Sequence, residues 1–465
     1  RFPTFCVYTK GSPTSTRKIC HPSTIPKNYN QLVRLYGLRG FRMIAFAKKE
    51  LSDDMFFKDM QRSECEKDMT FMGFFVMKNH LHPESGNEIA AMRNSHILSK
   101  MITGDSIYTA IAVSRECGLI EPRSKVLVAE VKTEGTNVNL SWIDVDDGTT
   151  NVNSMTSIDD SQTHLAITGD SFALVRNYCK NDVQRLMYQR LITRCHIFGE
   201  MIPTQKAELI NDLKQIDYFV AMVGDGANDS LALLASDVGF SLSEADTSFA
   251  AEFCADVDHC LSSVMIRQAS ALLDKVTINF KFILMYIVIQ YSACLYNNIS
   301  VLDQRNVCWQ GLCGLVLLVT MSLNQPVNSM HKQPPPKSIM SLSFLVSVFL
   351  QAFVQILALI FAMDSLEASS WYADFNINRQ PNSIQVKNLK RDYLFQLSNF
   401  QIVIAAAVLN FNCKYSRPFK NLWFLSVVFA IAVIDLIILF PFLAASSFAG
   451  AVQTSIWSLF GVTSS

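Results

Sequence analysis

The sequence predicts an α/β region followed by a helical membrane region, and three observations support this fold class. Strand-like and helix-like segments alternate between about residues 69 and 265, an order typical of a parallel sheet flanked by helices. The apolar stretch 218–223 ends abruptly at glycines and carboxylates, as a strand does at a ligand site. Beyond about residue 270, long stretches without charged residues dominate. The chain is therefore expected to contain both soluble and membrane domains.

Composition excludes several classes of protein. The chain has 465 residues, enough for two or three domains; half of them are hydrophobic and 17% are charged. The net charge is zero and no basic stripe stands out, so no nucleic-acid partner is expected. The 12 cysteines lack metal-ligand spacing and suggest no disulfide framework, which indicates a reducing compartment. Because the chain begins at Arg1 without a signal segment, we expect it to be part of a longer protein.

The soluble region is expected to hold two domains. Residues 1–67 contain short strand-like segments, including 41–47, and a turn at 10–13, so they predict only part of a sheet domain. Residues 68–265 predict a domain with a parallel sheet, interrupted by a polar insertion at 121–163 that has one hairpin of its own. The first elements predicted for this domain are a strand at 71–77, a helix opened by Pro83, a strand at 100–102 and a helix ending at Cys117.

The segment MVGDGAND at 222–229 is the strongest candidate for a functional site. Its glycines allow the backbone to approach a ligand closely, and Asp225 and Asp229 supply the oxygen ligands that Mg²⁺ prefers. Asp229 is also expected to cap the helix that follows. The alternative interpretation is a glycine-rich strand-to-helix turn whose aspartate serves only as a cap.

Two other motifs are expected at the same edge of the sheet. Thr103–Asp105 follow a predicted strand, and a threonine hydroxyl there can donate a hydrogen bond to a phosphoryl oxygen. Lys206 lies in the first turn of a helix opened by Pro203, where its ammonium group can meet an anion favoured by the helix dipole. The similar tripeptide at 168–170 follows a different strand and is interpreted as a turn.

Five apolar stretches are long enough to cross a bilayer, which takes roughly twenty residues. They lack a polar face and have short connections, which argues against buried helices of a soluble core. The loops 328–337 and 412–420 carry more lysine and arginine than the two loops that would lie on the other side of the membrane. Because cytoplasmic loops usually carry this excess, the soluble domains are expected in the cytosol. Residues 445–465 would form a tail on the other side. The predicted spans are about 276–296, 307–327, 338–363, 393–411 and 421–444.

Together these motifs resemble those of the P-type ATPases, and the resemblance covers nearly the whole chain. The matching segments are KGSP at 10–13, TGD at 103–105, P-x-x-K at 203–206 and GDGAND at 224–229, followed by predicted spans. The run SLSEAD at 241–246 resembles the B branch of the type V subgroup, whose members export polyamines from late endosomes and lysosomes. The A branch, a helix dislocase of the endoplasmic reticulum, typically has threonine where Ala227 stands.

The resemblance implies the domain types and the roles of the motif residues. It implies part of an α+β nucleotide-binding domain at 1–67, a Rossmann-like phosphorylation domain of the haloacid dehalogenase type at 68–265, and a multi-span membrane domain at 276–444. It implies that Lys10 and Arg42 contact ATP. The residues implied around the phosphoryl group and its Mg²⁺ are Thr103, Gly104, Asp105, Lys206, Asn228 and Asp229, with Asp225 and Asp229 as the metal ligands.

The sequence departs from the family pattern at three places. It contains no D-K-T-G-T, so the aspartate that the family phosphorylates is absent, and the chain is expected to be inactive by itself. Glu200 stands where the family usually has a cation near the nucleotide, which is expected to weaken activity. Gln310 is followed by Gly311, where the family usually has an acidic residue that would face a polycation.

Polar residues in the predicted spans suggest a substrate path. Tyr286 and Gln290 are four residues apart and share a helix face, and Tyr291 is the next residue around the helix. The family helix carries a Gln-Tyr pair here, which the resemblance assigns to polyamine binding through cation–π and amide contacts. The alternative is that these side chains only make interhelical hydrogen bonds. Asp435 in the fifth span is expected to be a protonated or hydrogen-bonded structural acid.

The motifs leave three functional hypotheses. The leading one is the C-terminal portion of an ATP-driven exporter of polyamines or related organic cations in an endolysosomal membrane. The second is a truncated or degenerate isoform that binds nucleotide or partners without turnover. The third is a soluble-type phosphatase fused to a membrane anchor, which is disfavoured because it would need the same aspartate. The sequence does not predict a partner subunit.

Overall fold

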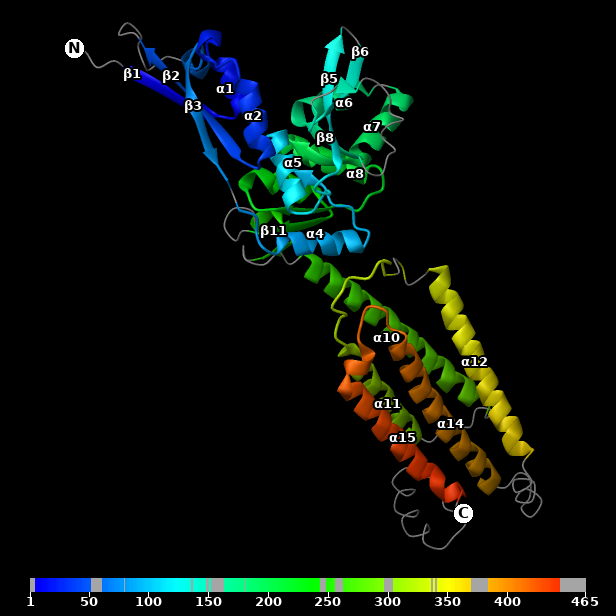
Figure 1. Cartoon of the computed structure of the whole chain (residues 1–465). Coiled ribbons are helices and arrows are strands. Elements are labelled where there is room, and N and C mark those ends of the chain that lie inside the picture. The colour runs from blue at the N-terminus through cyan, green and yellow to red at the C-terminus, as the bar shows by residue number, and fades with distance from the viewer. Residues whose placement is uncertain are drawn as a thin grey trace. The chain divides into compact units, whose positions relative to one another are not determined.

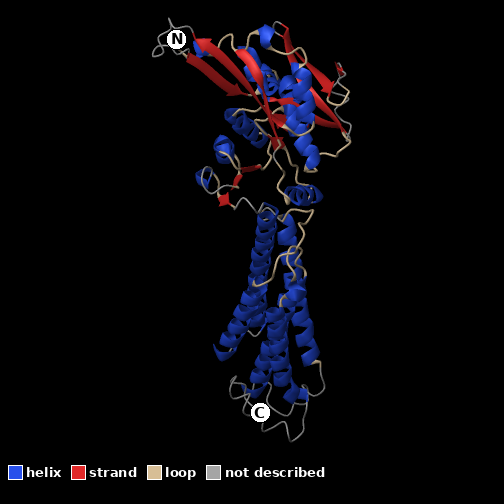
Figure 2. Ribbon diagram, turned by 60° about the vertical axis from the view of Figure 1, so that its left-hand side comes forward, coloured by secondary structure: helices blue, strands red, loops and turns tan. Residues whose placement is uncertain are grey.

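The computed structural model divides the chain into two compact units, Arg1–Ser263 and Val264–Ser465. The named strands all lie in the first unit, and the described part of the second is built from helices (Figure 2). Part of the SLSEAD run and the predicted tail 445–465 lie outside the described residues. The described residues are 5–443, apart from 52–60, 79, 135–136, 148–149, 152–162, 180, 243–247, 256–261, 297–303, 336–337, 339–340 and 369–383.

An antiparallel sheet forms the N-terminal part of the first unit. Its strands are β1 (Phe5–Gly11), β2 (Arg42–Leu51) and β3 (Thr70–Met77), and α1 (Pro13–Ile19), α2 (Tyr29–Leu38) and the short α3 (Arg62–Cys65) belong to the same part of the chain (Figure 1). The strand predicted at 71–77 is present as β3, but its predicted place in the parallel sheet was wrong, because it pairs antiparallel with β2. Its aromatic rings pack against Tyr29 of α2, with centroid distances of 5.2 Å to Phe71 and 4.8 Å to Phe74.

A six-stranded mixed sheet forms the centre of the unit. Its order is β4-β9-β8-β5-β6-β7, and the first four strands run parallel. The predicted hairpin in the polar insertion is present as β5 and β6. However, β5 also pairs with β8, so the insertion contributes a strand to the central sheet. The strands are β4 (Met101–Ile102), β5 (Lys125–Glu134), β6 (Asn137–Asp144), β7 (Thr150–Asn151), β8 (Thr163–Thr168) and β9 (Cys195–Gly199).

Helices cover both faces of this sheet. Side chains alternate between the faces of a strand, and in β8 Ala166 packs against α5 while Leu165 and Ile167 pack against α6, α7 and α8. These apolar layers hold the carboxyl ends of the parallel strands in place, where the predicted motifs lie. The helices of this part are α4 (Ser85–Asn94), α5 (Ile107–Glu116), α6 (Gly169–Tyr178), α7 (Asp182–Arg194) and α8 (Pro203–Lys214).

A small parallel sheet carries the GDGAND motif. It consists of β10 (Ala221–Gly224), β11 (Val238–Ser241) and β12 (Phe253–Cys254), with η3 (Ala227–Asp229) and α9 (Ser230–Ala235) after β10. The apolar stretch 218–223 suggested a buried parallel strand; β10 is parallel and Met222 is buried, but Val223 is 40% exposed. The strand β4 lies at an edge of the six-stranded sheet and β10 at an edge of this small one, so the prediction that the motifs share one sheet edge was wrong.

The second unit is a bundle of long helices. Apolar residues of α10, α11, α14 and α15 form its main core. By length and apolar composition, two described segments could cross a membrane, Leu342–Glu367 and Lys390–Phe411, and two apolar helices are shorter. The helices are α10 (Ser262–Tyr296), α11 (Gln304–Ser322), α12 (Leu342–Glu367), α14 (Ile384–Phe411) and α15 (Leu422–Leu443) (Figure 1).

Two histidines meet on neighbouring strands of the central sheet. His164 of β8 and His196 of β9 lie with ring centroids 4.7 Å apart, and β9 carries an extra residue here because the register shifts. Burial lowers the pKa of His196 to about 4 and also lowers the pKa of His164. The charged groups around the pair are mostly cationic, namely Lys100, Arg115 and Arg194, with Glu121 as the acidic one. Both imidazoles are therefore neutral at pH 7.

The histidine pair should make the fold sensitive to acid. Unfolded histidine takes up its proton near pH 6.5 and folded His196 only near pH 4, so stability is lost as the pH falls through this window. We expect His196→Phe to reduce that loss by up to roughly 3 kcal/mol. Urea midpoints from pulse proteolysis at pH 7 and below measure the effect. The exposed His21→Phe is the control, and equal acid losses in both variants would contradict the prediction.

Candidate functional site

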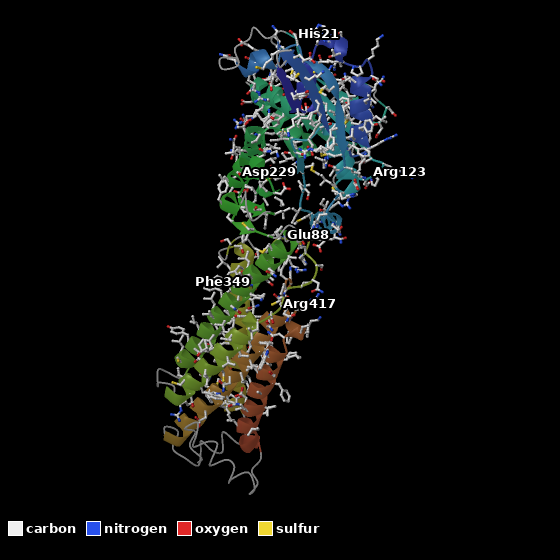
Figure 3. The ribbon with its side chains drawn as sticks, turned by 90° about the vertical axis from the view of Figure 1, so that its left-hand side faces the viewer. His21, Glu88, Arg123, Asp229, Phe349 and Arg417 are labelled. Carbon is white, nitrogen blue, oxygen red and sulfur yellow. The ribbon has the colours of Figure 1, made fainter. Side chains whose placement is uncertain are left out.

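A buried ion pair joins two of the predicted motifs. Lys206 Nζ lies 2.7 Å from Asp229 Oδ1, and the side chains are only 8% and 14% exposed. Figure 3 labels the position of Asp229 in the first unit. Pro203 opens α8, and Gln205 accepts a hydrogen bond from the Ile202 N–H, so the first turn of the helix is fixed. The prediction that Asp229 caps α9 with its side chain was wrong, because no such hydrogen bond forms. The carboxylate instead compensates the charge of Lys206.

Gly224 allows the motif to turn back on itself. A Cβ at this position would lie 2.8 Å from the Asp229 Cβ, a distance that carbon atoms do not tolerate. Any larger residue would therefore push Asp229 away from Lys206. The sequence predicted that the glycines allow the backbone to approach a ligand, whereas the close approach at Gly224 is to a side chain of the same motif.

Asp225 and Asn228 lie at the carboxyl end of β10 and are both exposed. The sequence placed Mg²⁺ between Asp225 and Asp229, but Asp229 is occupied by Lys206. Within the described ranges, no group of three or more His, Cys, Asp or Glu side chains could hold a metal ion. Mg²⁺ usually takes only one or two protein carboxylates and completes its shell with phosphate oxygens and water. Asp225 fits this requirement as a single exposed ligand.

The TGD segment forms a tight loop at the end of β4. The Asp105 N–H donates to Thr103 Oγ1 at 3.1 Å, and the Thr103 N–H donates to the Phe198 carbonyl at 2.9 Å. Arg42 reaches this loop from β2, with its Nε 3.1 Å from Asp105 Oδ1. Both side chains are partly exposed, so this pair is a weak tether between the two parts of the unit.

Backbone hydrogen bonds attach this loop to the segment that leads into α8. The Glu200 N–H donates to the Asp105 carbonyl at 2.8 Å, and the Met201 N–H donates to the Thr103 carbonyl at 3.0 Å. The TGD loop and the helix that carries Lys206 are thus held in one framework. This connection brings together two motifs that are about 100 residues apart in the sequence.

Glu200 contributes to the framework through an unusual backbone conformation. Its φ is +56°, in the left-handed region that non-glycine residues seldom adopt. Burial raises the pKa of its carboxyl group, and the Ile107 N–H at the start of α5 donates a hydrogen bond that partly offsets this effect. An acid at this position therefore caps the N-terminus of α5, where a negative charge is favourable.

The second TGD tripeptide also has a structural role. It was interpreted as a turn, but Thr168 is the N-cap of α6 and Gly169 is the first residue of that helix. A Cβ on Gly169 would lie 2.5 Å from the Glu200 carbonyl oxygen and 2.5 Å from Gln205 Oε1. Gln205 Nε2 also donates to the Gly169 carbonyl at 3.1 Å. Gly169 thus supports the start of α8.

Three further candidate residues of the first unit are Arg42, Lys10 and Gly104. Arg42 reaches the TGD loop, whereas Lys10 is exposed on β1, paired across the strands with Phe46. Gly104 lies in the TGD loop, and a Cβ there would be 3.4 Å from the Met201 carbonyl oxygen.

Of the three candidate residues on α10, Tyr286 and Gln290 face α11, whereas Tyr291 does not. Gln290 Nε2 donates to Gln310 Oε1 at 2.7 Å, so this residue of α10 faces α11. Tyr286 lies on the same face, where a Cβ on Gly314 would come within 3.1 Å of its ring and one on Gly311 within 3.8 Å of its hydroxyl. Tyr291 is 64% exposed and points away from this contact. Gly314 therefore makes room for the Tyr286 ring, whereas Gly311, which looked like a lost counter-charge in the sequence, lies at ordinary contact distance from the Tyr286 hydroxyl.

Sequence comparison with known proteins finds relatives that align with most of the chain. The chain is 29% identical over 483 residues to polyamine-transporting ATPase 13A3 of Homo sapiens, in an alignment that covers 93% of the chain and 39% of that protein. It is 30% identical over 441 residues to the vacuolar cation-transporting ATPase YPK9 of Saccharomyces cerevisiae, covering 90% of the chain and 30% of the relative. This chain is homologous to the type V P-type ATPases. The predicted resemblance is thereby confirmed.

Other comparisons define the extent of the match. The P-type ATPase homologue is also 30% identical over 390 residues to the probable cation-transporting ATPase 13A4 of Gallus gallus, covering 80% of the chain and 32% of the relative. No protein-family model matches the chain. The chain spans 39% or less of the length of these curated relatives.

Sequence reasoning missed the residues that connect the motifs of this P-type ATPase homologue. Glu200 was noticed as a departure from the family pattern, but its bond to the Asp105 carbonyl was not foreseen. Gln205 lies inside the P-x-x-K motif, and its contact with Gly169 joins the start of α6 to α8. The repeated TGD tripeptide was the available signal, because a glycine after a strand often marks a close backbone approach.

Proposed function

We propose that this chain is the C-terminal portion of an ATP-driven P-type transporter that exports polyamines or related organic cations. In this proposal the first unit combines part of a nucleotide-binding domain with an incomplete phosphorylation domain of the haloacid dehalogenase type. The helices of the second unit form five membrane spans. The names of the relatives, which include polyamine-transporting and cation-transporting ATPases, support this assignment.

The observation that carries the proposal is the buried Lys206–Asp229 ion pair, whose helix follows a segment that is hydrogen-bonded to the TGD loop. Phosphoryl transfer requires little covalent chemistry from the protein and depends on positioned cations and a divalent metal. A buried lysine held by Asp229 supplies a fixed positive charge, and Thr103 of the TGD loop supplies a hydroxyl donor for a phosphoryl oxygen. Asp229 keeps the ammonium group in place, and Asn228 is exposed beside it to support the phosphate.

ATP and Mg²⁺ fit the residues around this framework. Asp225 would hold Mg²⁺, which when bound neutralises the charge that develops on the transferring phosphate. Lys10 and Arg42 would contact the nucleotide from the antiparallel sheet. The chain contains no D-K-T-G-T, so the phosphorylated aspartate must come from sequence outside these 465 residues. The chain alone is therefore expected to be inactive.

The helical unit would hold the organic cation. Tyr286 and Gln290 lie on the face of α10 that contacts α11, where an aromatic ring and amide oxygens can bind ammonium groups. The first unit would be cytosolic, and an endolysosomal membrane agrees with the vacuolar relative in yeast. The names of the relatives do not favour the alternative of an isoform without turnover.

The test is polyamine-stimulated ATPase activity in the full-length transporter. We expect Gln290→Ala to raise the polyamine concentration for half-maximal stimulation about fivefold, because it removes a contact of about 1 kcal/mol. Phosphorylation from ATP should persist in this variant. The control is Gln401→Ala, since Gln401 is another buried amide, bonded to the Gln355 carbonyl at 2.9 Å. An unchanged polyamine requirement in Gln290→Ala would show that α10 does not bind the substrate.

A further inference from the structure

Three helices of the second unit enclose a group of buried polar side chains. Gln396 and Asn399 lie on one face of α14, and Asp435 faces them from α15; their exposed fractions are 4%, 4% and 0%. Asn399 Nδ2 donates to Asp435 Oδ1 at 3.2 Å, and Gln396 Nε2 donates to the Asp435 main-chain carbonyl at 2.7 Å. Helix α11 packs against both α14 and α15 (Figure 1). The contact joins buried polar side chains of two helices of the bundle.

Two oxygen atoms of this group have no hydrogen-bond donor among the described residues. They are Asp435 Oδ2 and Gln396 Oε1, and both are acceptors. A buried acceptor without a donor costs about 1–3 kcal/mol, and an uncompensated carboxylate costs more. Because both groups lack a donor and neither lacks an acceptor, the missing component must be a donor or a cation.

The neighbouring helices do not supply a compensating positive charge. Helix α15 contains no other ionisable residue. The group of α11 that interacts electrostatically with Asp435 is the Cys313 thiol. On α14 the nearest charged residues along the chain are Arg391 and Asp392, whose side chains approach each other to 3.6 Å. An ionised Asp435 would therefore have one amide donor and no cationic partner among the described side chains.

We propose that Asp435 is a proton-binding site inside the helix bundle, with Gln396 and Asn399 as its hydrogen-bond partners. The carboxylate takes up one proton from solvent on Oδ2 and becomes a neutral carboxylic acid. The new O–H donates to Gln396 Oε1, while Oδ1 continues to accept from Asn399. One proton thus satisfies both unpartnered oxygens and removes the buried charge.

The number of available ligands distinguishes a proton from a metal cation. A hard metal cation such as Ca²⁺ or Mg²⁺ takes six or more oxygen ligands. Here Oδ1 of Asp435 and the amide group of Gln396 are already engaged, which leaves two oxygens. A proton needs only one oxygen that binds it and a second oxygen that accepts its hydrogen bond, and the site contains these two. This inference does not depend on the transported substrate.

The experiment is infrared difference spectroscopy of the purified chain in detergent. We expect the C=O stretching band of a protonated carboxyl group at neutral pH, and we expect Asp435→Asn to remove it. Asparagine has nearly the same shape as the neutral acid, so the variant should fold. The control is Asp364→Asn on α12, where the side chain is exposed. Absence of the band at neutral pH, or its persistence in Asp435→Asn, would overturn the proposal.

A second pair of variants tests the partner and keeps Asp435 in place. Gln396→Leu removes the acceptor, so the carboxyl band should move to higher frequency as its O–H loses a hydrogen bond. Gln401→Leu is the matched control, because Gln401 is a buried amide of the same helix that bonds to Gln355 instead. Equal band positions in the two variants would exclude Gln396 as the partner of the proton.

Discussion

Replacing Lys206 with methionine should lower the free energy of unfolding of the first unit by about 3 kcal/mol or more. The substitution leaves the Asp229 carboxylate, which is 14% exposed, without its cation. Removal of one member of a buried ion pair is more destabilising than loss of the pair as a whole, because the remaining charge stays desolvated. Pulse proteolysis across a urea gradient measures the difference.

The same helix offers a matched control for this prediction. Lys214 also forms an ion pair, with its Nζ 3.0 Å from Asp237 Oδ1, but the side chains are 35% and 22% exposed. We expect Lys214→Met to cost less than about 1 kcal/mol, because solvent screens a pair of this kind. Equal destabilisation by the two substitutions would mean that the burial of Lys206 has no energetic consequence.

Replacing Asp225 with asparagine should abolish Mg²⁺-dependent phosphorylation of the full-length transporter. The site provides one exposed carboxylate for a metal whose other ligands come from phosphate and water, and a neutral amide is a poor substitute for a hard divalent cation. Incorporation of labelled phosphate from ATP after an acid quench is the measurement. The fold should be unaffected, because Asp225 is exposed.

Asp170 provides the comparison for this experiment. It belongs to the repeated TGD tripeptide and lies in the first turn of α6, at the end of a parallel strand of the same unit. We expect Asp170→Asn to retain phosphorylation. Normal phosphorylation of Asp225→Asn at ordinary Mg²⁺ concentrations would place the metal elsewhere.

Local sequence patterns predicted many of the elements correctly. Glycine, proline and the helix-starting residues predicted the beginning of α8 at Pro203 and the strand at Met101–Ile102. Patterns of this kind depend on the backbone of a few residues, so they do not require knowledge of distant contacts. Whether a strand pairs parallel or antiparallel with its neighbour was less predictable. The aromatic segment of β3 is compatible with either sheet, and its packing on Tyr29 selects the antiparallel one.

The motif residues were predictable for a similar reason. Thr103, Lys206 and Asp225 each stand where a strand ends or a helix begins, as the sequence predicted. The strands β4 and β10 nevertheless belong to separate sheets, so the expected single sheet edge is not formed. The role of Asp229 was not predictable in the same way. An aspartate before a helix ordinarily serves as its cap, but the buried ammonium group of Lys206 attracts it more strongly than the amide groups of α9 do.

The sequence by itself determined the order of soluble and apolar regions, the positions of the motifs and the resemblance to P-type ATPases, because each depends on residue type and spacing along the chain. The tertiary structure decided which side chains meet. The attachment of Glu200 to the TGD loop, the contact of Gln205 with Gly169 and the pairing of Asp435 with Asn399 join residues 36 to 95 positions apart. Such contacts depend on how the sheets and helices pack, and burial then makes an unpaired charge or polar group too costly to leave without a partner.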